Sequence, residues 1–182
     1  VHAMSHTIGS TYKQIHGRTN AVFLPNAIRY NGQIPTKFNS WPKYEVYTAP
    51  ETYQRIAREL GLPASTPEEG VESYAKAVED LRAKLGMPGS FKEMGIDEAK
   101  YMADLDMLTM RAFEDQCAPA NPRIPMLEHM RQLMIASYYG IRREEVQDGK
   151  PVAEAPASGR KGRAAKKAEA ECEPEGEGEA KE

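Results

Sequence analysis

Apolar residues recur three and four positions apart along most of the first 140 residues of this chain. Val71, Ala75 and Val78 give the clearest example, and the same spacing continues as far as Leu85. Residues spaced in this way lie on one face of a helix, and burial of that face stabilises the helix. The pattern therefore predicts an amphipathic helix over 67–85.

Helix-start and helix-stop residues define the bounds of this helix and of its neighbours. Thr66 can cap the helix, Pro67 suits its first position, and Glu69 stands three residues after the cap. Asp97 is a second helix start, and Gly140 is a helix stop. Together with the apolar spacing, such residues predict six helices, over 1–10, 17–30, 51–60, 67–85, 97–117 and 125–139.

No segment alternates apolar and polar residues in the manner of a β-strand, so the folded part is expected to be all-α. Residues 33–50 combine three prolines with four aromatic residues and show no sustained period, which indicates an ordered crossing loop. Pro25 falls inside an otherwise helical pattern. Because proline removes a helical hydrogen bond, we expect Pro25 near a first turn or at a kink.

The composition changes near the end of the chain. Residues 151–182 contain one branched apolar residue, Val152, and a basic block that is followed by an acidic block. A segment so poor in apolar side chains cannot offset the entropy lost on ordering. We therefore predict a folded domain over 1–145 and a disordered, charged tail over 146–182. A solvated terminus is the preferred interpretation of the charge blocks, and a weak interaction tail is the alternative.

The charge and the cysteines exclude several classes of protein. The 182 residues carry a net charge of -3, which favours neither nucleic-acid binding nor adsorption to a membrane. No apolar run approaches the roughly 20 residues that span a bilayer, and no signal-peptide pattern is present, so we expect a cytoplasmic protein. Cys117 and Cys172 lie in unlike surroundings, and a disulfide is not expected. The chain begins with Val1 inside a predicted helix without a cap, which indicates a fragment.

Three of the four histidines, His2, His6 and His16, fall within the first sixteen residues. His2 and His6 are four positions apart, so a helix would place both on one face. Imidazole is a common metal ligand and a proton carrier near neutral pH, so the cluster indicates metal or acid–base chemistry, with separate surface or capping histidines as the plainer alternative. No carboxylate occurs in the first forty residues, so the cluster resembles half of a metal site.

Two motifs surround these histidines. Residues 2–9 read His-Ala-Met-Ser-His-Thr-Ile-Gly, and residues 16–21 read His-Gly-Arg-Thr-Asn-Ala. This pair resembles the H-x-M-x-H-x-(L/I)-G and H-G-x-x-N-A motifs of the iron-dependent (group III) alcohol dehydrogenases. Further segments resemble the alcohol-dehydrogenase half of bifunctional aldehyde–alcohol dehydrogenases, and the resemblance covers residues 1 to about 140. These segments are Ile28-Arg-Tyr-Asn31, Ser40-Trp-Pro-Lys-Tyr44, Asp115-Gln-Cys117 and Ala120-Asn-Pro-Arg123.

The resemblance implies the helical C-terminal metal-binding domain of the dehydroquinate synthase-like, iron alcohol dehydrogenase fold. It makes His2 and His16 iron ligands. It gives His6 the place of the family's third histidine, which faces the nicotinamide and the substrate and handles protons without binding the metal. The family's two other ligands, an Asp and a His, and its dinucleotide-binding domain would lie upstream of Val1, so we expect the fragment to be inactive alone.

The implied activity is the NAD-dependent, fermentative interconversion of a short aldehyde, such as acetaldehyde, and its alcohol, ethanol. Imidazole and carboxylate ligands accept Zn²⁺ as well as Fe²⁺, so iron rests on the resemblance only. The parent enzyme would act on a small aldehyde or alcohol and form a homo-oligomer or filament. The alternatives are a monofunctional alcohol or diol dehydrogenase of the same group, and a non-catalytic helical assembly module.

Three other residues have competing interpretations. Cys117 lies in a proline-rich loop; a small buried residue is the default, and the resemblance favours the wall of a substrate channel. Arg18 stands where small or aliphatic residues are more usual in the family, and we expect it to face solvent or to form a salt bridge. His129 lies between charged residues in a predicted helix, where a surface position is expected.

Overall fold

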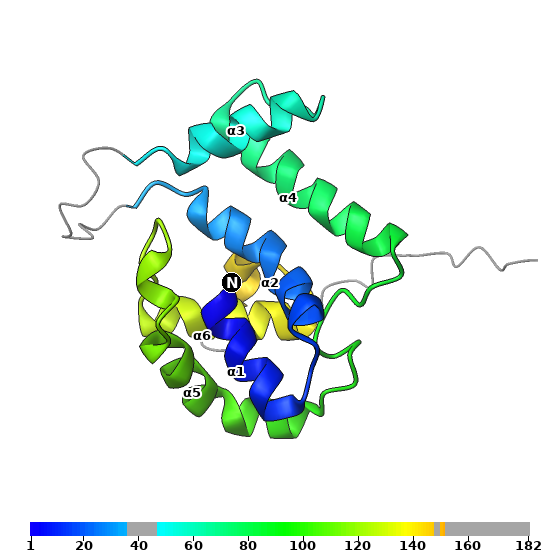
Figure 1. Cartoon of the computed structure of the whole chain (residues 1–182), viewed down its shortest axis with the longest axis vertical. Helices are drawn as coiled ribbons and strands as arrows, with labels where there is room; N and C mark the ends of the chain where they lie inside the picture. Colours follow the sequence, from blue (N-terminus) through cyan, green and yellow to red (C-terminus); the bar gives the residue numbers. More distant parts are fainter. Residues whose placement is uncertain (36–46, 148–149, 152–182) are drawn as a thin grey trace, which may run out of the picture.

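The computed structural model describes residues 1–35, 47–147 and 150–151. Within these ranges the chain folds into six α-helices (Figure 1). The helices are α1 (His2–Tyr12), α2 (His16–Asn31), α3 (Ala49–Glu59), α4 (Pro67–Lys84), α5 (Glu98–Glu114) and α6 (Leu127–Tyr139). Two 3-10 turns, η1 (Ala118–Ala120) and η2 (Arg143–Glu145), and two strands of two residues each, β1 (Val146–Gln147) and β2 (Lys150–Pro151), complete the described elements. The predicted all-α class is confirmed.

The predicted capping residues are found at the starts of α4 and α5 and at the end of α6. At the start of α4, the Thr66 hydroxyl oxygen accepts a hydrogen bond from the backbone N–H of Glu69 at 3.2 Å. At the start of α5, the Asp97 carboxylate accepts one from the backbone N–H of Lys100 at 2.8 Å. Gly140 ends α6 with a φ of 71°, a left-handed conformation that glycine adopts without strain.

Four helix bounds differ from the predicted ones by two or more residues: α3 begins at Ala49 and not at residue 51, α6 begins at Leu127 and not at Pro125, and α1 and α5 end elsewhere than predicted. α1 continues through Gly9, near its predicted end, and stops at Lys13, which has a left-handed φ of 54°. Tyr12 packs against the main core, so tertiary contact outweighs the low helix propensity of glycine. α5 ends at Glu114 because Asp115 adopts an extended backbone conformation, with φ −65° and ψ 137°.

Pro25 lies well inside α2, not at the first turn that was one of its two predicted places. Because proline has no N–H, the carbonyl of Ala21 loses its helical partner. The guanidinium of Arg82, from α4, donates to that carbonyl at 3.2 Å. A contact between two helices therefore satisfies a backbone group that the local sequence leaves open.

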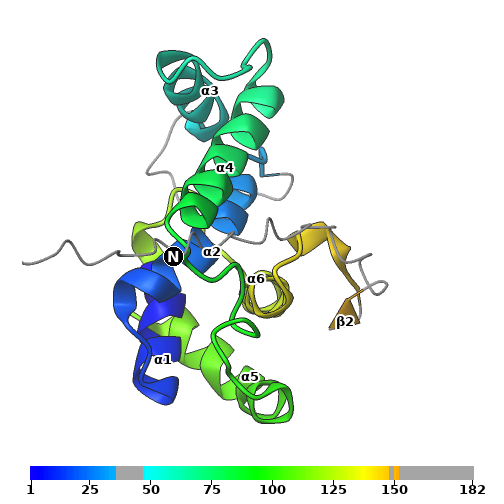
Figure 2. The ribbon, with the colours of Figure 1, turned by 90° about the vertical axis from the view of Figure 1, so that its right-hand side faces the viewer.

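The main core lies where α1, α2, α5 and α6 meet (Figures 1 and 2). Buried aromatic rings fill it: the ring centroids of Phe23 and Phe91 are 4.8 Å apart, and those of Tyr101 and Tyr138 are 4.6 Å apart. The Tyr101 hydroxyl donates to the backbone carbonyl of Met134 at 3.1 Å, so the polar end of this buried ring is satisfied. This core fixes α1, α2 and the end of α5 relative to one another.

Helices α3 and α4 form a hairpin that packs on α2 outside the main core (Figure 2). A smaller cluster of Ile28, Val71 and Ala75 joins α2 to α4. The two helices of the hairpin approach each other closely at Gly70 of α4, where an added Cβ would lie 2.6 Å from the Cα of Gln54 in α3. The hairpin therefore depends on the absence of a side chain at this position.

An ion-pair network also joins α2 to α4. Arg29 is only 8% exposed, and its guanidinium donates to Glu72 at 2.9 Å and to Glu79 at 2.6 Å. Arg142 binds the same Glu72 carboxylate at 2.6 Å. The hydrogen bonds from Arg29 lower the pKa of Glu72 although burial opposes this shift.

Val146, at the end of the described domain, is buried, and β1 pairs with β2 in an antiparallel ladder. Most of the tail that we predict over 146–182 and residues 36–46 of the predicted crossing loop lie outside the described residues. The domain boundary after residue 145 therefore stays a prediction. Among the described helices, none has the length and apolar character needed to cross a membrane.

Candidate functional site

The structure brings the three N-terminal histidines together. His2 and His6 lie on α1, and His16 is the first residue of α2. The distance between ring centroids is 5.1 Å for His2 and His16, 5.2 Å for His6 and His16, and 6.1 Å for His2 and His6. The left-handed turn at Lys13 ends α1 and allows α2 to begin beside it. The three candidate residues therefore form one cluster of side chains.

The three imidazole rings differ in orientation. The planes of His6 and His16 are stacked, with 21° between them, whereas His2 is inclined by 55° to His16 and by 75° to His6. The lone pairs of an imidazole lie in its ring plane. Stacked rings therefore do not aim their nitrogens at one point, whereas the inclined rings of His2 and His16 can converge on one metal ion.

His16 is held by its own helix. The side-chain amide nitrogen of Asn20, one turn further along α2, lies 2.9 Å from Nε2 of His16 and donates to it. The backbone carbonyl of His16 also accepts a hydrogen bond from the Thr19 hydroxyl at 2.8 Å. The Asn20 contact orients the ring, and because a side-chain amide N–H only donates, Nε2 of His16 is the unprotonated nitrogen that accepts this bond.

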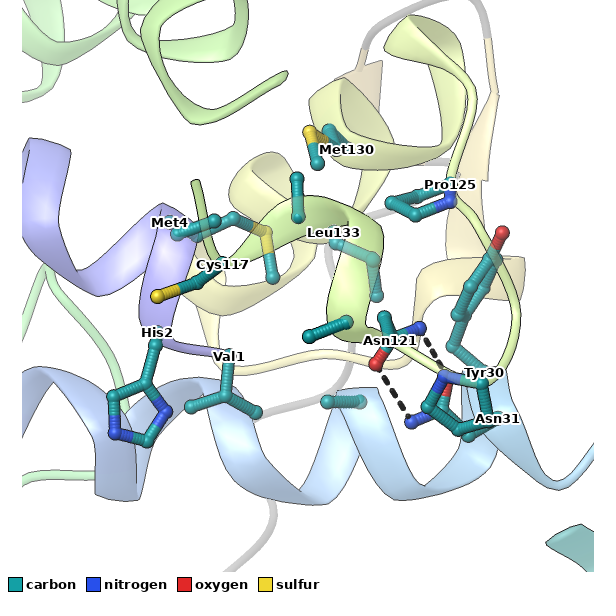
Figure 3. Close-up of a pocket in the computed structure, with 15 residues that line it drawn as sticks. Val1, His2, Met4, Tyr30, Asn31, Cys117, Asn121, Pro125, Met130 and Leu133 are labelled. Carbon is teal, nitrogen blue, oxygen red and sulfur yellow. Dashed lines mark hydrogen bonds between the residues drawn. The ribbon is translucent and has the colours of Figure 1, made fainter. Parts of the chain in front are cut away.

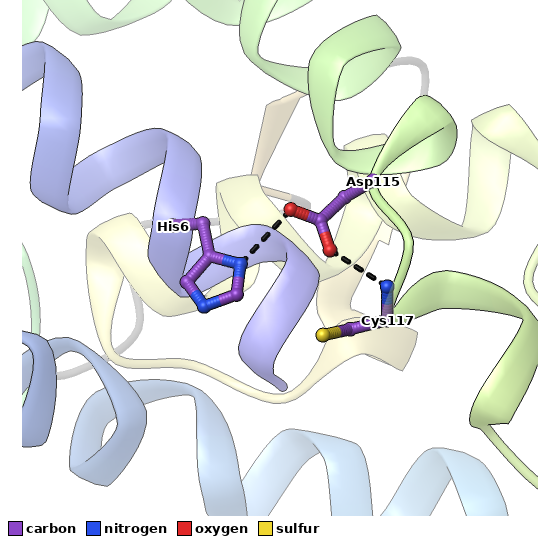
Figure 4. A group of neighbouring side chains, drawn as sticks. All are labelled: His6, Asp115 and Cys117. Carbon is purple, nitrogen blue, oxygen red and sulfur yellow. Dashed lines mark hydrogen bonds and ion pairs between the residues drawn. The ribbon is translucent and has the colours of Figure 1, made fainter.

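His6 pairs with a carboxylate from the distant end of α5 (Figure 4). Nδ1 of His6 lies 2.9 Å from Oδ2 of Asp115, and the two side chains are 40% and 16% exposed. Burial raises the pKa of Asp115, but hydrogen bonds from the backbone N–H of Cys117 and from His6 outweigh it and leave the pKa below its usual value. Asp115 thus brings a carboxylate to the histidine cluster, although none occurs in the first forty residues of the sequence.

Cys117 completes this group. Its backbone N–H donates to Oδ1 of Asp115 at 2.8 Å, and its thiol lies at the edge of the main core. Burial raises the pKa of the thiol, and the neighbouring Asp115 raises it further, so the thiol form is favoured. Donor atoms of His6, Asp115 and Cys117 lie within 4.8 Å of one another, close enough to be a second candidate set of metal ligands. Sequence reasoning used Asp115 only as part of a motif and did not identify its pairing with His6.

A mainly apolar pocket of about 480 Å³ opens beside His2 (Figure 3). His2 and Cys117 lie at one end of it, and Asn31 and Asn121 lie at the other end. The two asparagine amides are hydrogen-bonded to each other in both directions, at 3.2 and 2.8 Å. Cys117 is half-buried, packs against the core and lines this pocket, and its place in the wall of a substrate channel stays a prediction. Residues of the apolar wall include Met4, Ala27, Pro125, Met130 and Leu133.

The predictions for Arg18 and His129 have different outcomes. Arg18 is exposed, in agreement with one of its two predicted places. The predicted surface position of His129 is wrong, because its ring is half-buried and its Nδ1 lies 3.0 Å from the hydroxyl of Tyr30. The guanidinium of Arg123 stacks on the same Tyr30 ring, 4.1 Å from its centroid. His129 on α6 therefore has a structural partner on α2, 99 positions away in the sequence.

The fold and the clustered donors define a helical domain with a candidate metal site at the start of α1 and α2. The sequence model of the Fe-containing alcohol dehydrogenase family, C-terminal domain, matches residues 1–138. The chain belongs to this family, and the resemblance inferred from the histidine motifs is confirmed.

Known relatives place the chain more closely. The aldehyde-alcohol dehydrogenase of Streptococcus pneumoniae serotype 4 is 55% identical over 141 residues, which are 78% of this chain and 16% of that protein. The bifunctional aldehyde-alcohol dehydrogenase of Escherichia coli (strain K12) is 39% identical over 142 residues, again 16% of its length. The crystal structure of a 1,3-propanediol oxidoreductase superposes with a TM-score of 0.61 at 25% identity, over 75% of this chain and 32% of that one. The chain thus spans 16% of the length of these two curated relatives.

Proposed function

We propose that this chain is the metal-binding C-terminal part of an NAD-dependent, iron-containing alcohol dehydrogenase, within a bifunctional aldehyde–alcohol dehydrogenase. The enzyme would interconvert a short aldehyde, acetaldehyde, and its alcohol, ethanol, by hydride transfer. The gathering of His2, His6 and His16 carries this proposal. The similarity to aldehyde-alcohol dehydrogenases over 141 residues supports the class of reaction.

His2 and His16 are the proposed metal ligands. Two imidazoles that bind one ion at about 2.1 Å with a tetrahedral angle have ring centroids about 5 Å apart. The observed 5.1 Å between the rings of His2 and His16 fits this arrangement. Both residues are exposed, so donors from elsewhere can complete the coordination, and the metal would replace the Asn20 hydrogen bond at Nε2 of His16. Family membership favours Fe²⁺, and Zn²⁺ is the alternative because the same ligands accept both ions.

The chemistry of the proposed reaction is divided between the bound groups and the chain. A metal ion at this position would polarise the substrate oxygen, and NAD would carry the hydride. His6, beside both proposed ligands, is the proposed proton carrier. The apolar pocket next to His2 supports the exclusion of water from the reacting centre.

The proposed enzyme needs a second domain. The described residues provide two metal ligands in this assignment, and a catalytic site generally has at least three protein ligands. We propose that an upstream dinucleotide-binding domain supplies the remaining ligands, an Asp and a His, together with the NAD site. The match to only 16% of the length of curated relatives supports this arrangement.

The substitution His16→Ala in the longer protein tests the proposal. We expect both the bound metal, measured by elemental mass spectrometry, and NADH oxidation with acetaldehyde to fall to background. His129→Gln is the matched control, because it replaces a histidine outside the cluster and should leave both quantities unchanged. Cys117→Ser tests the second donor set and should also keep the metal.

Three results would contradict parts of this proposal. Retained metal and activity in the His16→Ala protein would exclude His16 as a ligand. Loss of metal from the Cys117→Ser protein, but not from the His16→Ala protein, would assign the ion to His6, Asp115 and Cys117. A metal-loaded wild-type protein that oxidises no NADH would favour the non-catalytic assembly module.

A further inference from the structure

The carboxylate of Asp115 is held at two points. Oδ1 accepts the backbone N–H of Cys117 at 2.8 Å, and Oδ2 lies 2.9 Å from Nδ1 of His6. Asp115 follows the last residue of α5 in an extended conformation, and Cys117 directly precedes the 3-10 turn η1. A backbone group two residues further on therefore directs one carboxylate oxygen, and this leaves the other oxygen facing the histidine ring (Figure 4).

This contact determines which nitrogen of His6 carries a proton. An ionised carboxylate only accepts hydrogen bonds, so a nitrogen 2.9 Å from it must donate. Nδ1 of neutral His6 is therefore protonated, and Nε2 has a free lone pair. In Figure 4 this second nitrogen points away from Asp115. The tautomer of a functional histidine is commonly fixed by the hydrogen bond of its other nitrogen.

We propose that Asp115 is a positioning residue that holds His6 in the Nδ1–H tautomer and presents Nε2 to the reacting centre. The ring of His6 lies 6.1 and 5.2 Å from those of His2 and His16, so Nε2 can serve a group bound beside them. The structural part of this inference depends only on the contact between His6 and Asp115. Its catalytic consequence rests on the proposed function.

The structural part is tested on the 182-residue chain itself. Long-range ¹H–¹⁵N correlation spectra of histidine-labelled protein, at about pH 8.5 where an ordinary imidazole is neutral, report the tautomer of each ring. We expect the Nδ1–H tautomer at His6 in the wild-type chain. The Nε2–H tautomer in the wild-type chain would overturn the proposal without the need for any variant.

Substitutions then identify the group responsible. Asp115→Asn should remove the preference for the Nδ1–H tautomer, because a side-chain amide can also donate to Nδ1. Glu114→Gln is the matched control, since it neutralises the preceding, exposed carboxylate. Cys117→Ser keeps the backbone N–H that holds Asp115, so it should preserve the tautomer. An unchanged tautomer in the Asp115→Asn chain, or a changed one in either control, would overturn the role of Asp115.

The catalytic consequence is measured in the longer protein. Asp115→Asn should lower kcat by about 10- to 100-fold, the range seen when metal sites lose an outer-shell hydrogen-bond partner, and should leave the metal content and the KM for NADH unchanged. An unchanged kcat, or a loss of metal, would refute a positioning role in catalysis. If the wild-type protein shows no NADH oxidation, the proposed function fails, and the tautomer spectra still decide the structural role of Asp115.

Discussion

Gly70→Ala provides a sharp test of the packing between α3 and α4, because helix propensity and the structure predict opposite signs. Gly70 lies in the first turns of α4 (Pro67–Lys84). In an isolated helix, alanine in place of glycine stabilises by about 1 kcal/mol. In this structure, the added Cβ would lie 2.6 Å from the Cα of Gln54 and 3.0 Å from its Cβ. The nearest atom belongs to a backbone, which cannot move away like the end of a flexible side chain.

The magnitude follows from these two effects. Overpacking typically costs 1–3 kcal/mol, and a backbone contact at 2.6 Å belongs near about 3 kcal/mol. Subtraction of the propensity gain of about 1 kcal/mol leaves a net destabilisation of about 2 kcal/mol. For a domain of this size, such a change lowers the melting temperature by about 4–8 °C.

Urea denaturation followed by circular dichroism measures this change as a lower midpoint. Gly17→Ala is the matched control, because Gly17 is also helical and nothing lies within 4 Å of its added Cβ. We expect the free energy of unfolding of the Gly17→Ala chain to be unchanged or raised by up to about 1 kcal/mol. A Gly70→Ala chain as stable as the wild type would refute the close approach of α3 and α4.

Two further predictions concern the core and the ion-pair network. Tyr101→Phe should lower the free energy of unfolding by about 1 kcal/mol, because it removes a buried hydrogen bond to Met134, and an unchanged urea midpoint would contradict this. Hydrogen bonds from Arg29 lower the pKa of Glu72 in the folded state. The contribution of Glu72 to the free energy of unfolding is therefore present above the ordinary glutamate pKa and is lost as the pH falls through the lowered pKa. The urea midpoint should therefore fall less between about pH 7 and about pH 3 in the Glu72→Gln chain than in the wild type, and an equal fall would show that Glu72 is not coupled to folding.

Most of the helices could be predicted because their signals are local. The caps at Thr66 and Asp97 and the stop at Gly140 act within a few residues, and the structure shows all three. Local rules failed where a distant segment supplied the missing stabilisation. α1 continues through Gly9 because its next turn packs on the core, and Pro25 is accommodated inside α2 with Arg82 bonded to the open carbonyl.

The sequence by itself determined that two histidine side chains, those of His2 and His6, lie on one face of α1. Four residues span about one helical turn, so His2 and His6 share a face once α1 forms, and the two motifs were sufficient to identify the family. The site as a whole was decided by tertiary structure, because no local period relates one helix to the next. Packing of the core places His16 beside α1 and brings Asp115 to His6 across 109 positions of sequence. Spacing along a chain fixes contacts within a helix, whereas contacts between helices depend on which apolar faces are buried together.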